Sequence, residues 1–222
     1  MKSLIFDAGP LISLTMNGML PILEKLKKEF SGDFIITPQV RKEVIDKPMS
    51  IRKYKFEAIR IQNLIDKGIL KLSSTFIKDS MIEKETRNLM KIINSAFSTR
   101  YEKINLVHEG EVSCLAFSNL YGKENVIITD ERTIRMLIEA PKNLKDLMER
   151  KLNTEIKIDN KKLFNLLKFK LIRSSELIYI AYKKNLIELK KNKENLEAML
   201  YALKFTGTAV SSKEIEEIKS LA

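Results

Sequence analysis

The sequence has little of the chemistry on which many enzyme classes depend. It contains one cysteine, Cys114, and one histidine, His108. A single copy of each excludes a disulfide scaffold, a zinc finger and a zinc enzyme with Cys/His ligands. A Ser-His-Asp triad is disfavoured as well, because it would have to use His108 as its base. Glycine (7) and proline (5) are also scarce, which excludes a collagen-like or disordered chain.

Long apolar runs are missing too. No run reaches the roughly 18 residues that a membrane-spanning helix needs. Met1-Lys2-Ser3 leads directly into a strand-like run, and no small-residue cleavage site follows it. We therefore expect no signal peptide, no membrane partner and a cytoplasmic location. With 44% hydrophobic and 31% charged residues among 222, the composition is typical of a soluble globular protein.

Basic residues outnumber acidic ones. The chain has 40 Lys and Arg against 29 Asp and Glu, a net charge of +11. Residues 142–193 hold 15 of the basic residues and only 6 of the acidic ones. A polyanionic partner such as a nucleic acid explains this excess, and a lysine-rich solvated surface is the alternative. The best candidates for contacts with a nucleic-acid backbone are Lys161, Lys162, Lys168, Lys170 and Arg173.

Short apolar runs alternate with amphipathic segments. We expect strands at residues 3–6, 34–36, 69–72, 126–128 and 169–172, with 155–158 as a rival for the last. Helices are expected at 11–30 in two parts, from Pro38, at 49–67, from Ser80 to about Phe97, from Glu109, from Glu131, from Ser174 or Ser175, at 195–204 and at 213–221. This alternation predicts an α/β fold with a doubly wound parallel sheet covered on both faces. No repeat or clear linker divides the chain, so we predict one domain over residues 1–222.

Four acidic residues stand where chemistry is possible. Asp7 and Asp130 each follow a predicted strand, and open parallel sheets bind ligands at the carboxyl ends of their strands. Glu43 lies about two turns into a helix, and Glu111 lies in the first turn of another. Each has a plain structural alternative, because Asp130 is also placed to cap a helix and a helix-surface Glu is usually solvated.

Converging carboxylates repel one another, and such clusters usually persist because a hard cation neutralises them. A site with oxygen ligands only favours Mg²⁺ or Mn²⁺ over zinc. A divalent cation site on a basic protein suggests phosphodiester hydrolysis, in which the metal activates a water and stabilises the charge of the transition state.

Four segments resemble the motifs of PIN-domain nucleases. In chain order they are Ile5-Phe6-Asp7-Ala8-Gly9-Pro10-Leu11-Ile12, Thr37-Pro38-Gln39-Val40-Arg41-Lys42-Glu43-Val44, Gly110-Glu111-Val112-Ser113-Cys114-Leu115-Ala116 and Ile127-Ile128-Thr129-Asp130-Glu131-Arg132. Their order, and their positions at the expected strands and helices, make the resemblance specific. Residues 172–187 are also similar to the last strand and helix of the family.

The resemblance implies a five-stranded sheet of order 3-2-1-4-5 flanked by helices, and metal-dependent cleavage of single-stranded or structured RNA. It implies that the catalytic acids holding Mg²⁺ or Mn²⁺ are Asp7, Glu43, Glu111 and Asp130. The two aspartates would bind the cation directly and the two glutamates through waters, with water as the nucleophile. A hydroxyl after the last strand, from Ser174 or else Ser175, would help to hold the acidic site.

The chain departs from the family near two of these acids. Ala-Gly-Pro follows Asp7 where many members have a hydroxyl residue, so that support for Asp7 would come from Ser13 or Thr129. Glu131 stands where a second Asp is common, and we interpret it as a first-turn acid rather than as a fifth ligand.

Two segments are longer than in the compact toxins of this family. They are a helical insertion at about 76–105 and a basic, extended C-terminal part at about 141–222. A toxin silenced by an antitoxin is therefore one alternative. Another is a PIN-like RNA-binding scaffold, catalytically weak, in an RNA-processing assembly. A homodimer or higher even oligomer is expected from the family and from symmetry.

Overall fold

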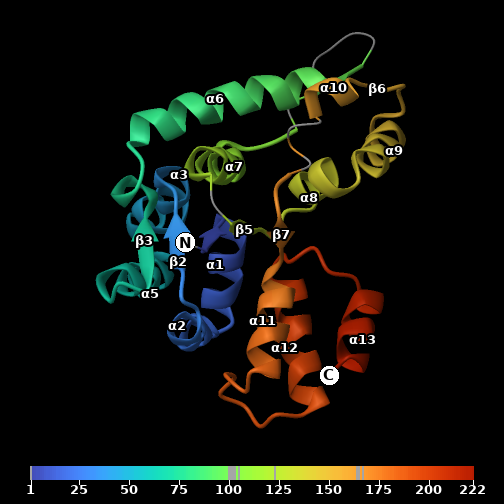
Figure 1. Cartoon of the computed structure of the whole chain (residues 1–222). Coiled ribbons are helices and arrows are strands. Elements are labelled where there is room, and N and C mark those ends of the chain that lie inside the picture. Colours follow the sequence, from blue (N-terminus) through green and yellow to red (C-terminus); the bar gives the residue numbers. More distant parts are fainter. Residues whose placement is uncertain (1, 100–103, 105, 123, 164–165, 167) are drawn as a thin grey trace.

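The chain folds around a central parallel sheet with helices on both sides (Figure 1). The computed structural model describes residues 2–99, 104, 106–122, 124–163, 166 and 168–222. Residues 100–103 and 105 of the predicted insertion at 76–105 lie outside the described residues.

Five parallel strands make up the central sheet. They are β1 (Ser3–Phe6), β2 (Asp33–Ile36), β3 (Leu70–Leu72), β5 (Asn125–Ile128) and β7 (Leu171–Ile172). β1 lies in the middle, between β2 and β5, and Phe6 is in register with Ile128. The predicted α/β fold with a parallel sheet covered by helices is confirmed, and its physical basis is the run of apolar residues in each strand.

The order of the strands is β3-β2-β1-β5-β7, and not the expected 3-2-1-4-5. Two short strands, β4 (Phe97–Ser98) and β6 (Lys157–Ile158), pair antiparallel in a sheet of their own. We expected no strand at β4, and β6 falls within the rival segment 155–158. Of the two rival segments, 155–158 contains β6 and 169–172 contains β7. Only β7 joins the central sheet.

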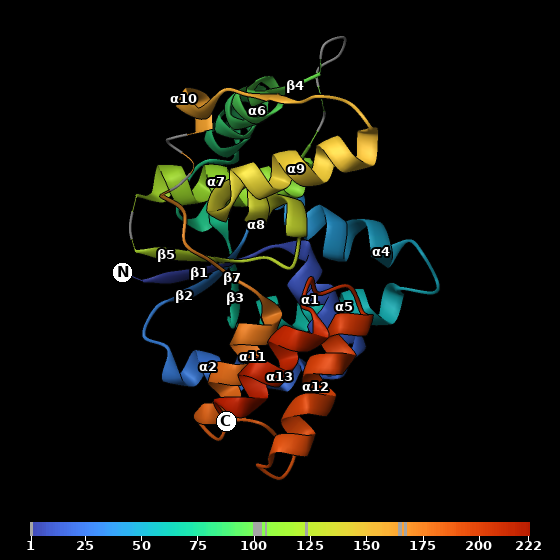
Figure 2. The same cartoon turned by 90° about the vertical axis from the view of Figure 1, so that its right-hand side faces the viewer.

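The helices form two layers. One side of the sheet holds α1 (Ala8–Met16), α2 (Leu20–Glu29), α11 (Ser174–Lys183), α12 (Lys193–Phe205) and α13 (Ser212–Ser220). The other side holds α6 (Asp79–Ala96), α7 (Glu109–Tyr121), α8 (Arg132–Glu139), α9 (Pro141–Leu152) and α10 (Asn160–Leu163). Both views show these layers (Figures 1 and 2).

The connection from β2 to β3 is made of short helices. It runs through α3 (Pro38–Arg41), the π-helical segment η1 (Lys42–Asp46), α4 (Lys47–Met49) and α5 (Lys55–Asp66). The 3₁₀ turn η2 (Ser73–Thr75) follows β3. The single helix predicted at 49–67 is wrong at its start. Turn hydrogen bonds from Ile51 N to Pro48 O and from Tyr54 N to Ile51 O replace its first turn.

One continuous cluster of buried apolar side chains extends from Ile5 to Ile215. Its centre lies between the sheet and its helices, where the rings of Phe6 and Phe34 are 5.3 Å apart. The α6 side chains Ile82 and Ile93 are fully buried in the same cluster. Within the described part of the chain, none of the helices has the length and apolar character needed to span a membrane.

Candidate active site

The four acids singled out in the sequence line one pocket. Asp7 directly follows β1, and Asp130 comes two residues after β5, its parallel neighbour, so both lie at the carboxyl edge of the sheet. η1 supplies Glu43, and the first turn of α7 supplies Glu111. The cavity has a volume of about 370 Å³ and is lined by Asp7, Ala8, Gly9, Glu43, His108, Glu111, Asp130, Glu131 and Gly207.

Asp7 is buried and fixed at both carboxylate oxygens. Its Oδ1 accepts from the backbone N of Ala8 (2.8 Å), so that the side chain caps α1. Its Oδ2 accepts from the hydroxyl of Thr129 (2.8 Å). Burial raises the pKa of Asp7 to about 6, with added repulsion from Glu43 and Asp130, although both hydrogen bonds favour the anion.

Thr129 therefore takes the supporting role for which Ser13 was the alternative. The Ser13 hydroxyl instead donates to the backbone O of Thr206 (3.4 Å), outside the pocket lining. The position of Thr129 explains why it, and not Ser13, contacts Asp7. Thr129 directly follows β5, Asp7 directly follows the adjacent strand β1, and their side chains therefore lie side by side.

Asp130 is not the N-cap of α8, the helix that follows it. The cap of α8 is Glu131, whose carboxylate accepts from Thr133 N (3.1 Å). Asp130 instead accepts from the backbone N and the hydroxyl of Ser174 (2.9 and 2.8 Å) and from the Thr208 hydroxyl (3.0 Å). Burial raises the pKa of Asp130, and these hydrogen bonds partly offset the increase.

Thr208 is a residue that the sequence analysis missed. It lies in the connection between α12 and α13, 78 residues from Asp130, and its side chain is buried. No motif or spacing marks it, because its role depends only on how the C-terminal helices pack. Of the two serines proposed to support the site, Ser174 contacts Asp130, whereas the buried Ser175 hydroxyl has no hydrogen-bond partner among the described residues.

Glu43 reaches the pocket from a π-helical segment. A π-helix is rare and frequently found at functional sites, because its wider turn re-aims side chains. The Glu43 carboxylate lies against Gly110, where a Cβ atom would stand 2.5 Å from Oε1. Gly110 therefore leaves the space that the Glu43 carboxylate occupies.

Glu111 is half-buried at the start of α7. Its Oε2 accepts from the backbone N of His108 (3.1 Å). The pKa of Glu111 is raised to about 8, mainly by burial and also by the charges of Asp7, Glu131 and Glu43, although the hydrogen bond from His108 favours the anion. Without a cation in the pocket, Glu111 thus holds a proton near neutral pH.

The residues predicted to contact nucleic acid do not gather at this pocket. Lys168 and Lys170 precede β7 and line a cavity of about 970 Å³ with Lys2 and Asn125. Because β1, β5 and β7 begin there, this cavity lies at the amino edge of the sheet, opposite the acids. Lys161 and Lys162 are exposed at α10, where Lys162 pairs with Asp159.

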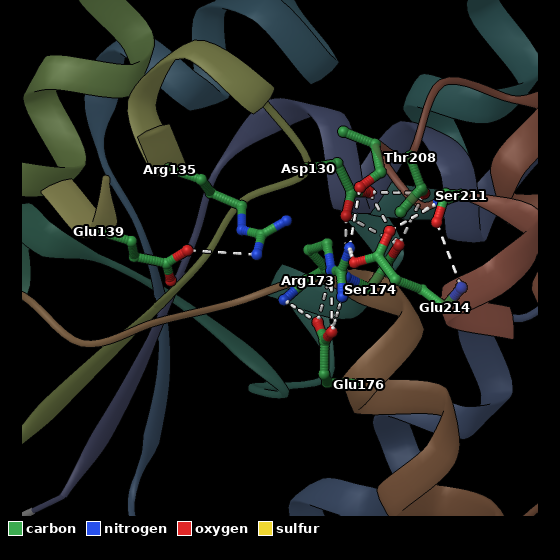
Figure 3. Close-up of polar contacts among 10 residues, drawn as sticks. Asp130, Arg135, Glu139, Arg173, Ser174, Glu176, Thr208, Ser211 and Glu214 are labelled. Carbon is green, nitrogen blue, oxygen red and sulfur yellow. Dashed lines mark hydrogen bonds and ion pairs between the residues drawn. The ribbon is translucent and has the colours of Figure 1, made fainter. Parts of the chain in front are cut away.

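For Arg173, one of these five residues, the structure contradicts the prediction. It is buried, and its guanidinium is held by Glu176 and Glu214 (Figure 3). A charged side chain buried in two ion pairs is not free to bind a phosphate, so the prediction that Arg173 contacts nucleic acid is wrong.

The donor set of the pocket suits a hard cation, because all four acids offer oxygen ligands and repel one another. As placed, however, no three or more His, Cys, Asp or Glu side chains among the described residues form a group that could hold a metal ion. The carboxylates thus share a pocket without having adopted a coordinating arrangement.

Comparisons with known proteins add no relative. Neither the models of known protein families, nor the curated proteins, nor the solved structures include a match to this chain.

Proposed function

We propose that this protein is a PIN-like, metal-dependent endoribonuclease that hydrolyses RNA phosphodiester bonds. The observation that carries the proposal is the pocket that collects Asp7, Glu43, Glu111 and Asp130 from four distant segments. The sheet adds support. It has the five parallel strands flanked by helices that the PIN resemblance implies.

The residues that would hold Mg²⁺ or Mn²⁺ are Asp7 and Asp130 directly, with Glu43 and Glu111 through bound waters. A cation bound there would activate a water and stabilise negative charge on the phosphorus centre. The chain's own contribution is orientation. The hydrogen bonds of Thr129 and Ala8 fix Asp7, and those of Ser174 and Thr208 fix Asp130.

The raised pKa values of the acids bear on how a cation binds. Glu111, with a pKa of about 8, and Asp7, with a pKa of about 6, must release protons before they can act as anionic ligands. Cation binding therefore releases protons and strengthens with pH over this range. The net charge of +11 gives the protein a sequence-independent attraction for RNA.

The test is cleavage of a pool of mixed-structure RNAs with Mg²⁺ or Mn²⁺. Parallel reactions contain EDTA or the Asp7→Asn/Asp130→Asn double variant. We expect cleavage that requires both the cation and the two aspartates. Cleavage that persists in the double variant would not come from the proposed site, and the assay would then give this function no support.

A catalytically weak RNA-binding scaffold is the second candidate. The observation that favours it is the lack of a ready coordinating group among the described acids. A scaffold would retain RNA without cleaving it at any Mn²⁺ concentration. Filter binding beside the cleavage assay separates the two functions.

A further inference from the structure

We infer that Arg173 is a positioning residue, which couples the C-terminal helices α11 and α13 to Asp130. This inference rests on the proposed function, because Asp130 is one of the acids proposed to bind the cation. Its basis is a set of contacts that we call the Arg173 network: Arg173, Glu176, Glu214, Ser211 and the backbone O of Ala209 (Figure 3).

The first step is how Asp130 is held. Its carboxylate accepts hydrogen bonds from Ser174, at the start of α11, and from Thr208, before α13. The two hydroxyls are also 2.9 Å apart and bonded to each other. The backbone N of Ala209 donates to the backbone O of Asp130 (3.3 Å). The position of the Asp130 carboxylate therefore depends on two chain segments that must keep their places relative to each other.

The second step is what keeps these segments together. Arg173 adjoins Ser174 in the chain, and its Nη1 donates to Ala209 O (2.9 Å), next to Thr208. The same Nη1 donates to Glu214 on α13 (2.7 Å). One side chain thus links the segment that carries Ser174 to the segment that carries Thr208.

The third step is that both acids of the network are fixed in turn. Glu214 completes the capping box of α13, since its Oε2 accepts from the backbone N of the N-cap residue Ser211 (2.8 Å). Glu176 accepts from Arg173 Nε (2.8 Å) and from the backbone N of Arg173 (2.7 Å). The forked guanidinium meets two carboxylates and one carbonyl in three directions, which the single ammonium of a lysine does not reproduce.

The chain also contains a matched control. Lys219 on α13 pairs with Glu197 on α12 (2.6 Å), so this ion pair also holds α13 against a neighbouring helix, without contacting Asp130 or its partners. If the Arg173 network only stabilised helix packing, loss of either ion pair would have the same consequences. If it positions Asp130, only loss of the network would disturb the acidic pocket.

The experiment compares Arg173→Lys, Glu214→Gln and Thr208→Val with the control Glu197→Gln in the full chain. Thr208→Val removes the last contact of the path while leaving the ion pairs intact, so it tests the path if Arg173→Lys fails to fold. For each folded variant, Mn²⁺ affinity is measured by electron paramagnetic resonance. Hydrogen exchange is measured at the amides of Ser174 and Ala209, which donate to Asp130.

We expect Arg173→Lys, Glu214→Gln and Thr208→Val to bind Mn²⁺ about 10-fold or more weakly, as is typical when partners of metal ligands are lost. Exchange at Ser174 and Ala209 should become faster in Arg173→Lys and Glu214→Gln. Excess Mn²⁺ should restore RNA cleavage by these variants. Glu197→Gln should match the wild type in Mn²⁺ affinity and in exchange at both amides.

Two different results would overturn the inference. Network variants that bind Mn²⁺ as tightly as the wild type, or a Glu197→Gln variant that loses the same affinity, would show that the network only stabilises packing. A wild-type chain that binds no Mn²⁺ would instead refute the proposed function, and this inference with it. The two failures differ because the first requires a wild-type protein that binds the cation.

Discussion

At the scale of residues, the pocket concentrates buried negative charge. Asp7 and Glu111 have pKa values of about 6 and about 8, and burial is the main cause in both. Enzymes commonly place such perturbed groups where they act, although a raised pKa by itself does not distinguish an enzyme from a binding protein. It does predict how the stability of the metal-free protein depends on pH.

Without divalent cations, the free energy of unfolding should decrease as pH rises from about 4.5 to about 8. Over this range the folded chain keeps protons on Asp7 and Glu111 that the unfolded chain has already released. Urea unfolding in EDTA at several pH values measures the slope. Glu111→Gln should make the free energy of unfolding depend less on pH in the upper part of this range. Asp7→Asn should stabilise the protein by about 2 kcal/mol at pH 8 while abolishing cleavage. A stability that rises with pH over this range would contradict the prediction.

Gly110 provides a second test at this scale. In Gly110→Ala the new Cβ would stand 2.5 Å from Glu43 Oε1, so the carboxylate must move away. Stability should stay the same or rise by about 0.5–1 kcal/mol, because alanine favours a helix. Cleavage and Mn²⁺ affinity should fall.

A double-mutant cycle isolates the cause. In a Glu43→Ala background, Gly110→Ala should have no further effect on Mn²⁺ affinity, since the displaced group is gone. A further loss in that background would mean that Gly110 acts through something other than Glu43.

At the scale of elements, the segment after η2 is integrated into the fold. The resemblance in the sequence led us to expect an insertion at residues 76–105, yet α6 buries Ile82, Leu89 and Ile93 in the common core. An element with this much buried apolar surface contributes to the stability of the whole. We therefore expect α6 to unfold together with the sheet.

The variant Ile93→Ala should lower the free energy of unfolding by about 2–5 kcal/mol, the usual loss for a large aliphatic side chain in a core. Met81→Ala, on the exposed side of the same helix, should change it by less than about 0.5 kcal/mol. Denaturant unfolding followed by circular dichroism measures both. A separate early transition for α6 in the wild type would contradict this expectation.

At the scale of the whole molecule, the acids and two of the candidate RNA-binding lysines lie at opposite edges of the sheet. Lys168 and Lys170 line the amino-edge cavity, and the acids line the carboxyl-edge pocket. A short oligonucleotide at the acids would not reach these lysines, whereas a long RNA wrapping the molecule would. The size of the RNA should therefore decide whether the lysines matter.

The double variant Lys168→Gln/Lys170→Gln should weaken the binding of long RNA and lower its salt dependence by about 1.4 in log–log slope, from two lost contacts to a single strand. Cleavage of a short oligonucleotide should not change. Fluorescence anisotropy across a salt series measures the slope, with Lys190→Gln/Lys193→Gln as the exposed control pair. An unchanged slope would assign the two lysines to the solvated surface.

The parallel sheet, the helices around it and the four acids could be predicted from the sequence, because these depend on local patterns. Apolar runs mark strands that are buried on both faces, and a carboxylate directly after such a strand lies at the sheet edge. Local patterns also predicted too much: the helix at 49–67 starts later than expected, because turn hydrogen bonds compete with its first turn.

Which groups hold those acids depends on the tertiary structure. Thr208 reaches Asp130 from 78 residues away, and Arg173 is buried between Glu176 and Glu214 instead of facing solvent. The physical reason is that hydrogen-bond partners at long sequence separation are set by how helices pack, and no periodicity along the chain records that packing. The distribution of charge on the surface depends on the tertiary structure in the same way. Composition shows that basic residues are in excess, but the fold sets the edge of the sheet at which each lysine lies.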